Sequence, residues 1–167
     1  MRRKVVGLST FVCVLLGGLA FAQAGEKPRA RATFGFLFET GYGEKVDTFH
    51  GLVTKDLGAH PDTTIALVLT PGELDSVYRK VEEVRLFEVP DLRAPDDCLM
   101  RPNTWVRLVI RADTTERSFQ WEEQWGCSDS LRATRSWKSL MGVIDLIREI
   151  VEAKPEYRAL PPGGRYE

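Results

Sequence analysis

The sequence predicts an α+β fold, a two-layer sandwich in which an antiparallel sheet of about five strands is covered on one face by two helices. Three patterns support this class: alternating apolar residues around Phe36, a helix-capping signal at Thr70, and two alternating segments joined by a short turn near Asp113. The expected order is β-β-β-α-β-β-α. It occupies a single domain, residues 32–153, between a leader at 1–24 and an irregular tail at 154–167.

The leader has the pattern of a cleavable secretory signal peptide. Residues 1–4 carry three positive charges, an apolar run follows to Leu19, and small residues offer cleavage after Ala22 or Ala24. The apolar run is shorter than the roughly 20 residues that a spanning helix needs, so we expect no membrane span after cleavage. The mature chain is expected in the periplasm or outside the cell.

The charge balance argues against two classes of partner. The chain has 23 Lys and Arg against 24 Asp and Glu, and loss of the leader removes basic residues only. A nucleic-acid binder or a polybasic membrane-surface protein would concentrate positive charge, which this composition does not favour.

The first half of the domain is expected to form three strands. Phe34, Phe36 and Phe38 alternate with other residues, which predicts a strand with its phenylalanines in the core. A turn at 41–44 leads into a second strand near 46–54. After a break at Pro61-Asp62, the β-branched segment 63–69 predicts the third strand.

A helix must begin at Thr70. Residues 70–73 form a capping box with Pro71 at the first helical position. The helix is expected to end before Pro90. Its apolar residues keep helical spacing: Leu74, Val77, Tyr78, Val81 and Val84.

A hairpin is expected next, with arms at 104–111 and 116–125 and a turn at 112–115. If the turn is centred between Asp113 and Thr114, the two residue numbers of each facing pair add up to about 227. The three pairs on the face assigned to the core are Val106 with Trp121, Leu108 with Phe119, and Ile110 with Arg117. The three pairs on the outer face are Trp105 with Glu122, Arg107 with Gln120, and Val109 with Ser118.

The second helix is expected from about Leu131 or Thr134 to Ala153, where Lys154-Pro155 stops it. Its broad apolar face suits a helix lying across a sheet. The residues of the main stripe are Trp137, Leu140, Met141, Ile144, Ile147 and Val151.

Cys98 and Cys127 are the cysteines left after the leader and Cys13 are removed, an even number in an oxidising compartment. Their numbers sum to about 225, close to the hairpin register, so extending the two arms brings them almost opposite each other. A disulfide is therefore expected. Two free thiols and an intermolecular bridge remain the alternatives.

Catalytic and metal-binding patterns are weak. His50, Asp56, His60 and Asp62 supply four ligand types in a short segment, but their spacing matches no zinc-site pattern, so we expect exposed histidines and neither metal nor cofactor. No serine stands in a nucleophile-elbow sequence. The neighbouring acids Glu122 and Glu123 would point to opposite faces of a strand, unlike a glycosidase pair.

The outer face of the hairpin is the predicted binding site, made of Trp105, Arg107, Gln120 and Glu122. A tryptophan beside charged and amide groups has the composition of a recognition patch. In the alternative, Trp105 lies under the loop at 91–103 and belongs to the fold.

Three segments resemble those of a group of small, secreted, uncharacterised bacterial proteins, a domain of unknown function. They are HGLVTKDL at 50–57, TTIALVLTPGELDSVYRKVEEVRLFEVPDL at 63–92 and KPEYRALPPGGRYE at 154–167. The resemblance implies a location in the bacterial envelope or outside the cell. It implies no catalytic residues.

These observations favour a non-catalytic binding or inhibitor-like module that acts on an envelope protein or peptide. One alternative is a hydrolase that uses His50, His60 and nearby acids, and another is a structural envelope protein. A cleft lined by titratable groups would favour the enzyme, whereas a flat exposed sheet face would favour the binder. The oligomeric state does not follow from the sequence.

Overall fold

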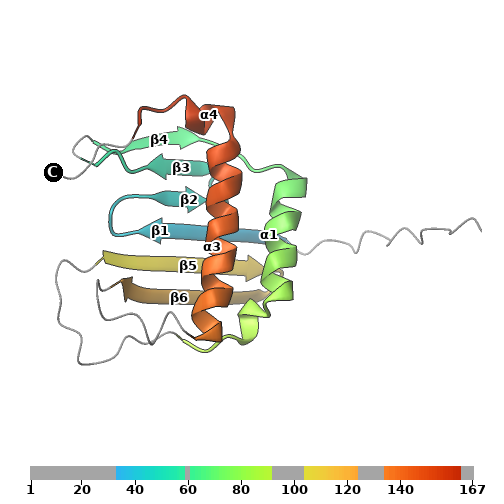
Figure 1. Ribbon diagram of the computed structural model, residues 1–167. Coiled ribbons are helices and arrows are strands. Elements are labelled where there is room, and N and C mark those ends of the chain that lie inside the picture. The colour runs from blue at the N-terminus through green and yellow to red at the C-terminus, as the bar shows by residue number, and fades with distance from the viewer. Residues whose placement is uncertain (1–32, 59–60, 92–103, 124–133, 163–167) are drawn as a thin grey trace, which may run out of the picture. The chain divides into compact units, whose positions relative to one another are not determined.

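The computed structural model of the chain describes residues 33–58, 61–91, 104–123 and 134–162, and the elements below belong to these residues (Figure 1). All of these residues belong to the compact unit Arg31–Glu167. The expected signal peptide, His60, Cys98 and Cys127 lie outside the described residues.

The sheet has six antiparallel strands in the order β4-β3-β2-β1-β5-β6. The predicted α+β class with an antiparallel sheet is confirmed. The strands are β1 (Phe34–Thr40), β2 (Lys45–Asp47), β3 (Leu52–Lys55), β4 (Thr63–Ala66), β5 (Thr104–Ala112) and β6 (Thr115–Glu123).

The sixth strand arises because the segment expected as one strand at 46–54 divides into β2 and β3. The carboxylate of Asp47 accepts the backbone N–H groups of Phe49 and His50 at 3.1 and 3.2 Å, which turns the chain. Gly51 follows with φ of 65°, a conformation that glycine adopts without strain. Val46 then pairs with Val53, and both remain in the core.

Two long helices cover one face of the sheet (Figure 1). Helix α1 (Pro71–Glu83) starts with the predicted capping box: Thr70 Oγ1 accepts the Glu73 N–H, and Glu73 accepts the Thr70 N–H. A short 3-10 turn, η1 (Leu86–Glu88), follows it. Helix α3 (Arg135–Ala153) is capped by Thr134, one of its two expected starting points.

The tail expected to be irregular contains a further short helix, α4 (Pro155–Arg158). Pro155 ends α3 and also begins α4, because proline is suited to the first turn of a helix. Tyr157 of α4 is half-buried and packs against the core. This contact explains why the chain coils again after the break at Lys154.

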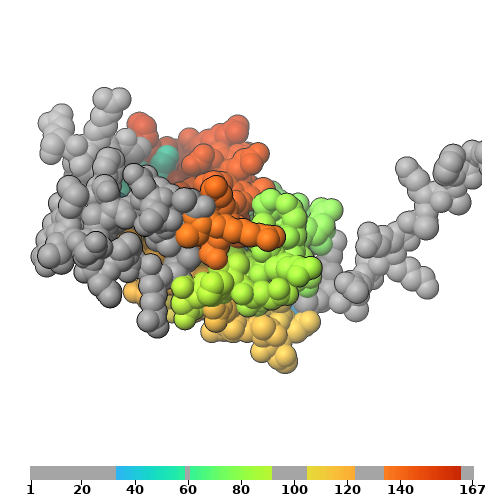
Figure 2. All heavy atoms as spheres, turned by 60° about the horizontal axis from the view of Figure 1, so that its bottom comes forward, coloured from blue at the N-terminus to red at the C-terminus, as the bar shows by residue number. Residues whose placement is uncertain are grey.

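The predicted hairpin register is confirmed at every pair of β5 and β6, from Thr104 with Glu123 to Ala112 with Thr115. Asp113 has φ of 52° in the two-residue turn, as a tight hairpin requires. The even-numbered apolar residues of β5 therefore face the helices. In Figure 2, α1 (green) lies beside α3 (orange), and the hairpin (yellow) adjoins them.

The core lies between the helices and the sheet. Its largest fully buried side chains come from β1, β5, β6, η1 and α3, and include Phe36, Phe38, Phe119, Leu86, Leu108, Ile110, Leu140, Ile144 and Ile147. The side of the sheet turned away from the helices is called the open face below.

Candidate functional site

The open face carries two rows of side chains that run across all six strands. The register places the members of the first row side by side, from Thr64 through Thr54, Lys45, Glu39 and Arg107 to Gln120. The second row runs from Ala66 through Leu52, Asp47, Leu37 and Val109 to Ser118. The first row is polar or charged, and the second is mostly apolar.

All four residues of the predicted binding site lie on this face. Trp105 stands opposite Glu122, Arg107 stands opposite Gln120, and 40% of the Trp105 surface is exposed. Arg107 Nη1 donates to Glu39 Oε1 at 3.1 Å, which links β5 to β1. The hairpin register therefore brings the predicted site together.

Apolar side chains near the β2–β3 turn extend the open face. Phe49 and Leu52 are exposed, and the Phe49 ring lies over Gly35, where a Cβ atom would meet Phe49 Cε1 at 2.7 Å. The Arg111 guanidinium stacks on the same ring at 4.8 Å from its centre. Sequence reasoning missed Phe49, although Gly35 in the middle of a strand is a signal of close approach.

His50 is placed in the same turn, where its Nδ1 lies 2.9 Å from Asp47 Oδ2. The Asp47 carboxyl is buried, which by itself raises its pKa. Hydrogen bonds from the ring and backbone of His50, with the charges of His50 and Lys45, outweigh burial and lower the pKa of Asp47 below its ordinary value. The pair stabilises the turn, and the His50 side chain is mostly exposed.

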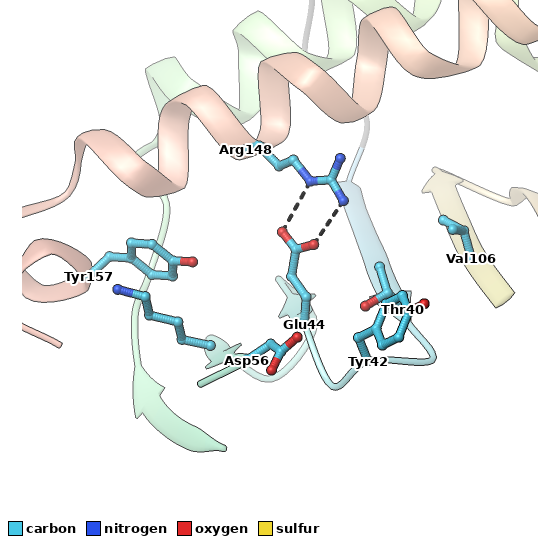
Figure 3. A pocket seen from close by; sticks show the side chains of 8 residues that line it. Thr40, Tyr42, Glu44, Asp56, Val106, Arg148 and Tyr157 are labelled. Atoms are coloured by element: carbon cyan, nitrogen blue, oxygen red, sulfur yellow. Dashed lines mark hydrogen bonds and ion pairs between the residues drawn. The ribbon is translucent and has the colours of Figure 1, made fainter. Parts of the chain in front are cut away.

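A pocket of about 260 Å³ lies on the helix side of the sheet, at the end where β1 turns into β2 (Figure 3). It is lined by Thr40, Tyr42, Glu44, Lys55, Asp56, Val106, Arg148 and Tyr157. Arg148 points from α3 to Glu44 and binds it at two points, 3.1 and 2.8 Å. His50 is not among the lining residues.

Three charged side chains of this pocket contact other residues of its lining. Glu44 is bound to Arg148, and the Lys55 ammonium lies 4.9 Å from the centre of the Tyr157 ring. Burial raises the pKa of the Tyr157 hydroxyl, and the charges of Glu44 and Glu152 raise it further, whereas Arg148 lowers it. The phenol therefore keeps its proton at neutral pH.

The sequence did not indicate this pocket, because its residues are far apart along the chain. They come from β1, the β1–β2 turn, the end of β3, β5, α3 and a helix, α4, that was not expected. Gly43 is a local signal: its φ is 99°, and a Cβ atom there would overlap the Asp62 carboxylate. The turn at 41–44 is thus fixed closely against the start of β4.

No family model matches the chain, and no curated protein matches it. Among the described residues, no three His, Cys, Asp or Glu side chains gather as ligands for a metal ion. Within the same residues, no helix is long and apolar enough to cross a membrane.

Proposed function

We propose that this chain is a small exported, non-catalytic binding or inhibitor-like module, and that it recognises a protein of the cell envelope through the open face. The observation that carries this proposal is the exposure of Trp105 on the side of the sheet that the described helices leave uncovered. Exposed tryptophan contributes little to folding, but a partner that buries it gains a large apolar area.

The open face also has the anatomy of a protein interface. Leu52 is exposed and Leu37 partly exposed in the mostly apolar row, in which Val109 is buried, and Lys45 and Arg107 belong to the charged row beside it. Interfaces combine an apolar centre with a polar rim that fixes the orientation of the partner. The ion pair between Arg107 and Glu39 presents both signs of charge to that partner.

The size of the face favours a folded protein over a small molecule. Six strands at the usual spacing give a width of about 24 Å, and the length falls from about 30 Å at β5 and β6, with nine residues each, to about 10 Å at β2, with three. The area of the face is therefore on the order of 600 Å². One side of a standard protein interface buries about 800 Å², so the face would form most of one side of such an interface.

The test compares two equally exposed aromatic residues on opposite sides of the sheet. A partner captured from the envelope fraction is purified, and its Kd is measured for the wild-type chain, Trp105→Ala and Tyr42→Ala. Tyr42 is the matched control, because it is 42% exposed and lines the pocket on the helix side. We expect Trp105→Ala to weaken binding about 30-fold, equivalent to about 2 kcal/mol, and Tyr42→Ala to have little effect.

Two results would contradict the proposal. Loss of binding in Tyr42→Ala with full binding in Trp105→Ala would place the site at the pocket. Loss of binding in His50→Ala alone would favour a site at the turn between β2 and β3, as the hydrolase alternative requires.

Export is part of the proposal and has a test of its own. The signal-peptide pattern predicts a mature N-terminus at Gln23 or Gly25, which intact mass of the protein from the periplasm or the medium measures. Retention of Arg2 in that material would contradict export with cleavage.

A further inference from the structure

The outer edge of β4 is an unpaired edge of the sheet among the described residues. The Leu67 N–H donates to the Gly51 carbonyl at 2.8 Å, so the backbone groups of residues 63, 65 and 67 point toward β3. Those of Thr64, Ala66 and Val68 therefore point away from the sheet. The side chains of these three residues are exposed, and Val68 is 77% exposed.

This edge lacks the usual protection against strand pairing. The segment 63–69, Thr-Thr-Ile-Ala-Leu-Val-Leu, contains no charge, no proline and no glycine. Edge strands normally carry charges, prolines or bulges that block pairing with another chain. At the opposite edge, β6 has Glu116 and Glu122 on its open-face side. β4 is therefore the less protected of the two edges of the sheet.

We infer that the segment 64–68, which starts within β4 and continues two residues past its end at Ala66, pairs with the same segment of a second copy, antiparallel about a two-fold axis at Ala66, to join two sheets into one. In this register Thr64 lies opposite Val68 of the partner subunit, and Ile65 lies opposite Leu67 of the partner subunit. Apolar or neutral residues meet at every pair of the segment. The outward backbone groups of residues 64, 66 and 68 form about six hydrogen bonds across the axis.

The occupant is a second copy because the segment is complementary to itself. No residue of the segment 64–68 is charged, so no like charges meet across the axis. Leu52 pairs with Ala66 and is itself exposed, so the apolar surface continues inward from the edge onto the open face.

The first experiment measures the oligomeric state of the full chain by analytical ultracentrifugation over a range of concentrations. We expect a reversible dimer. Ala66→Lys places two ammonium groups opposite each other at the axis and should raise the dimer dissociation constant about tenfold or more. Ser118→Lys is the matched control, an exposed open-face position on the other edge strand, and should leave dimerisation unchanged.

The second experiment tests the register itself. Because residue 66 faces its own copy, mixing Ala66→Lys with Ala66→Glu should restore a dimer that neither variant forms well alone. A wild-type chain that stays monomeric at all concentrations would overturn the inference. So would equal effects of Ala66→Lys and Ser118→Lys, or a mixture that does not associate. Circular dichroism melts of each variant establish that the fold is retained.

Discussion

Arg148 of α3 holds Glu44 of the β1–β2 turn through two parallel contacts, Nε to Oε1 at 3.1 Å and Nη2 to Oε2 at 2.8 Å. This pair closes the helix layer onto the end of the sheet (Figure 3). Both side chains are partly buried, so the pair is screened less by water than a surface pair.

We therefore expect a measurable coupling energy between Glu44 and Arg148. A double-mutant cycle with Glu44→Gln and Arg148→Met, measured by urea denaturation, should give about 1 kcal/mol. The pair of Arg111 with Glu116 on the hairpin is the control, because both side chains are about half exposed. Its coupling energy should stay below about 0.5 kcal/mol. Equal coupling energies in the two pairs would show that partial burial does not strengthen the pair of Glu44 with Arg148.

Gly35→Ala should destabilise the protein by about 1 kcal/mol, although alanine is ordinarily the better residue in a strand. The new Cβ atom would meet the Phe49 ring at 2.7 Å and displace it from Arg111. In a Phe49→Ala background the same change should be neutral or stabilising. Chemical denaturation of the single and double variants measures the change in the free energy of unfolding. If Gly35→Ala destabilised the protein equally with and without the Phe49 ring, the packing of Phe49 on Gly35 would be contradicted.

Asp47 should make stability depend on pH in the acid range. Its folded pKa is lowered, so its contribution is complete above the unfolded-state pKa of about 3.9 and is lost as the pH falls through the folded-state value. Asp47→Asn should cost about 1 to 3 kcal/mol near neutral pH and less in acid. Chemical denaturation of the wild-type chain and of Asp47→Asn, from about pH 6 downward, measures the difference between their free energies of unfolding at each pH. A difference that does not change with pH would contradict the lowered pKa of Asp47 in the folded state.

Cys98 and Cys127 are predicted to form a disulfide, because in the sequence Cys98 precedes β5 and Cys127 follows β6, and the first residue of β5, Thr104, pairs with the last of β6, Glu123. Closing a loop of about 30 residues stabilises the folded state by roughly 3.5 kcal/mol on the chain-entropy account. Reduction should therefore lower the melting temperature, whereas the double variant Cys98→Ser with Cys127→Ser should be insensitive to reductant. Two titratable thiols in the native oxidised protein would contradict the bridge.

The register of the hairpin could be predicted, because the turn centre and the two opposite periodicities together allow one pairing, whereas the arms end one or two residues away from their expected bounds. The same register places Trp105 and Arg107 on the open face. The capping box at Thr70 was equally local, since all of its contacts lie within four residues.

The turn between β2 and β3 was missed because β2 is only three residues long and Asp47 looks like an ordinary strand residue in the sequence. What makes the turn is the hydrogen bonding of the buried Asp47 side chain, which alternation of apolar residues does not reveal. The pocket was missed for a different reason. Glu44 and Arg148 are about a hundred positions apart, and only the packing of α3 on the sheet brings them together.

The most direct test of the proposed binding face is methyl cross-saturation NMR of the labelled chain in complex with its captured partner. Leu52 is exposed on the open face, and Leu108 is fully buried on the helix side. We predict transfer of saturation from the partner to the methyl groups of Leu52 and Leu37, and none to Leu108. Transfer confined to Val106, which lines the pocket on the helix side, would contradict recognition through the open face.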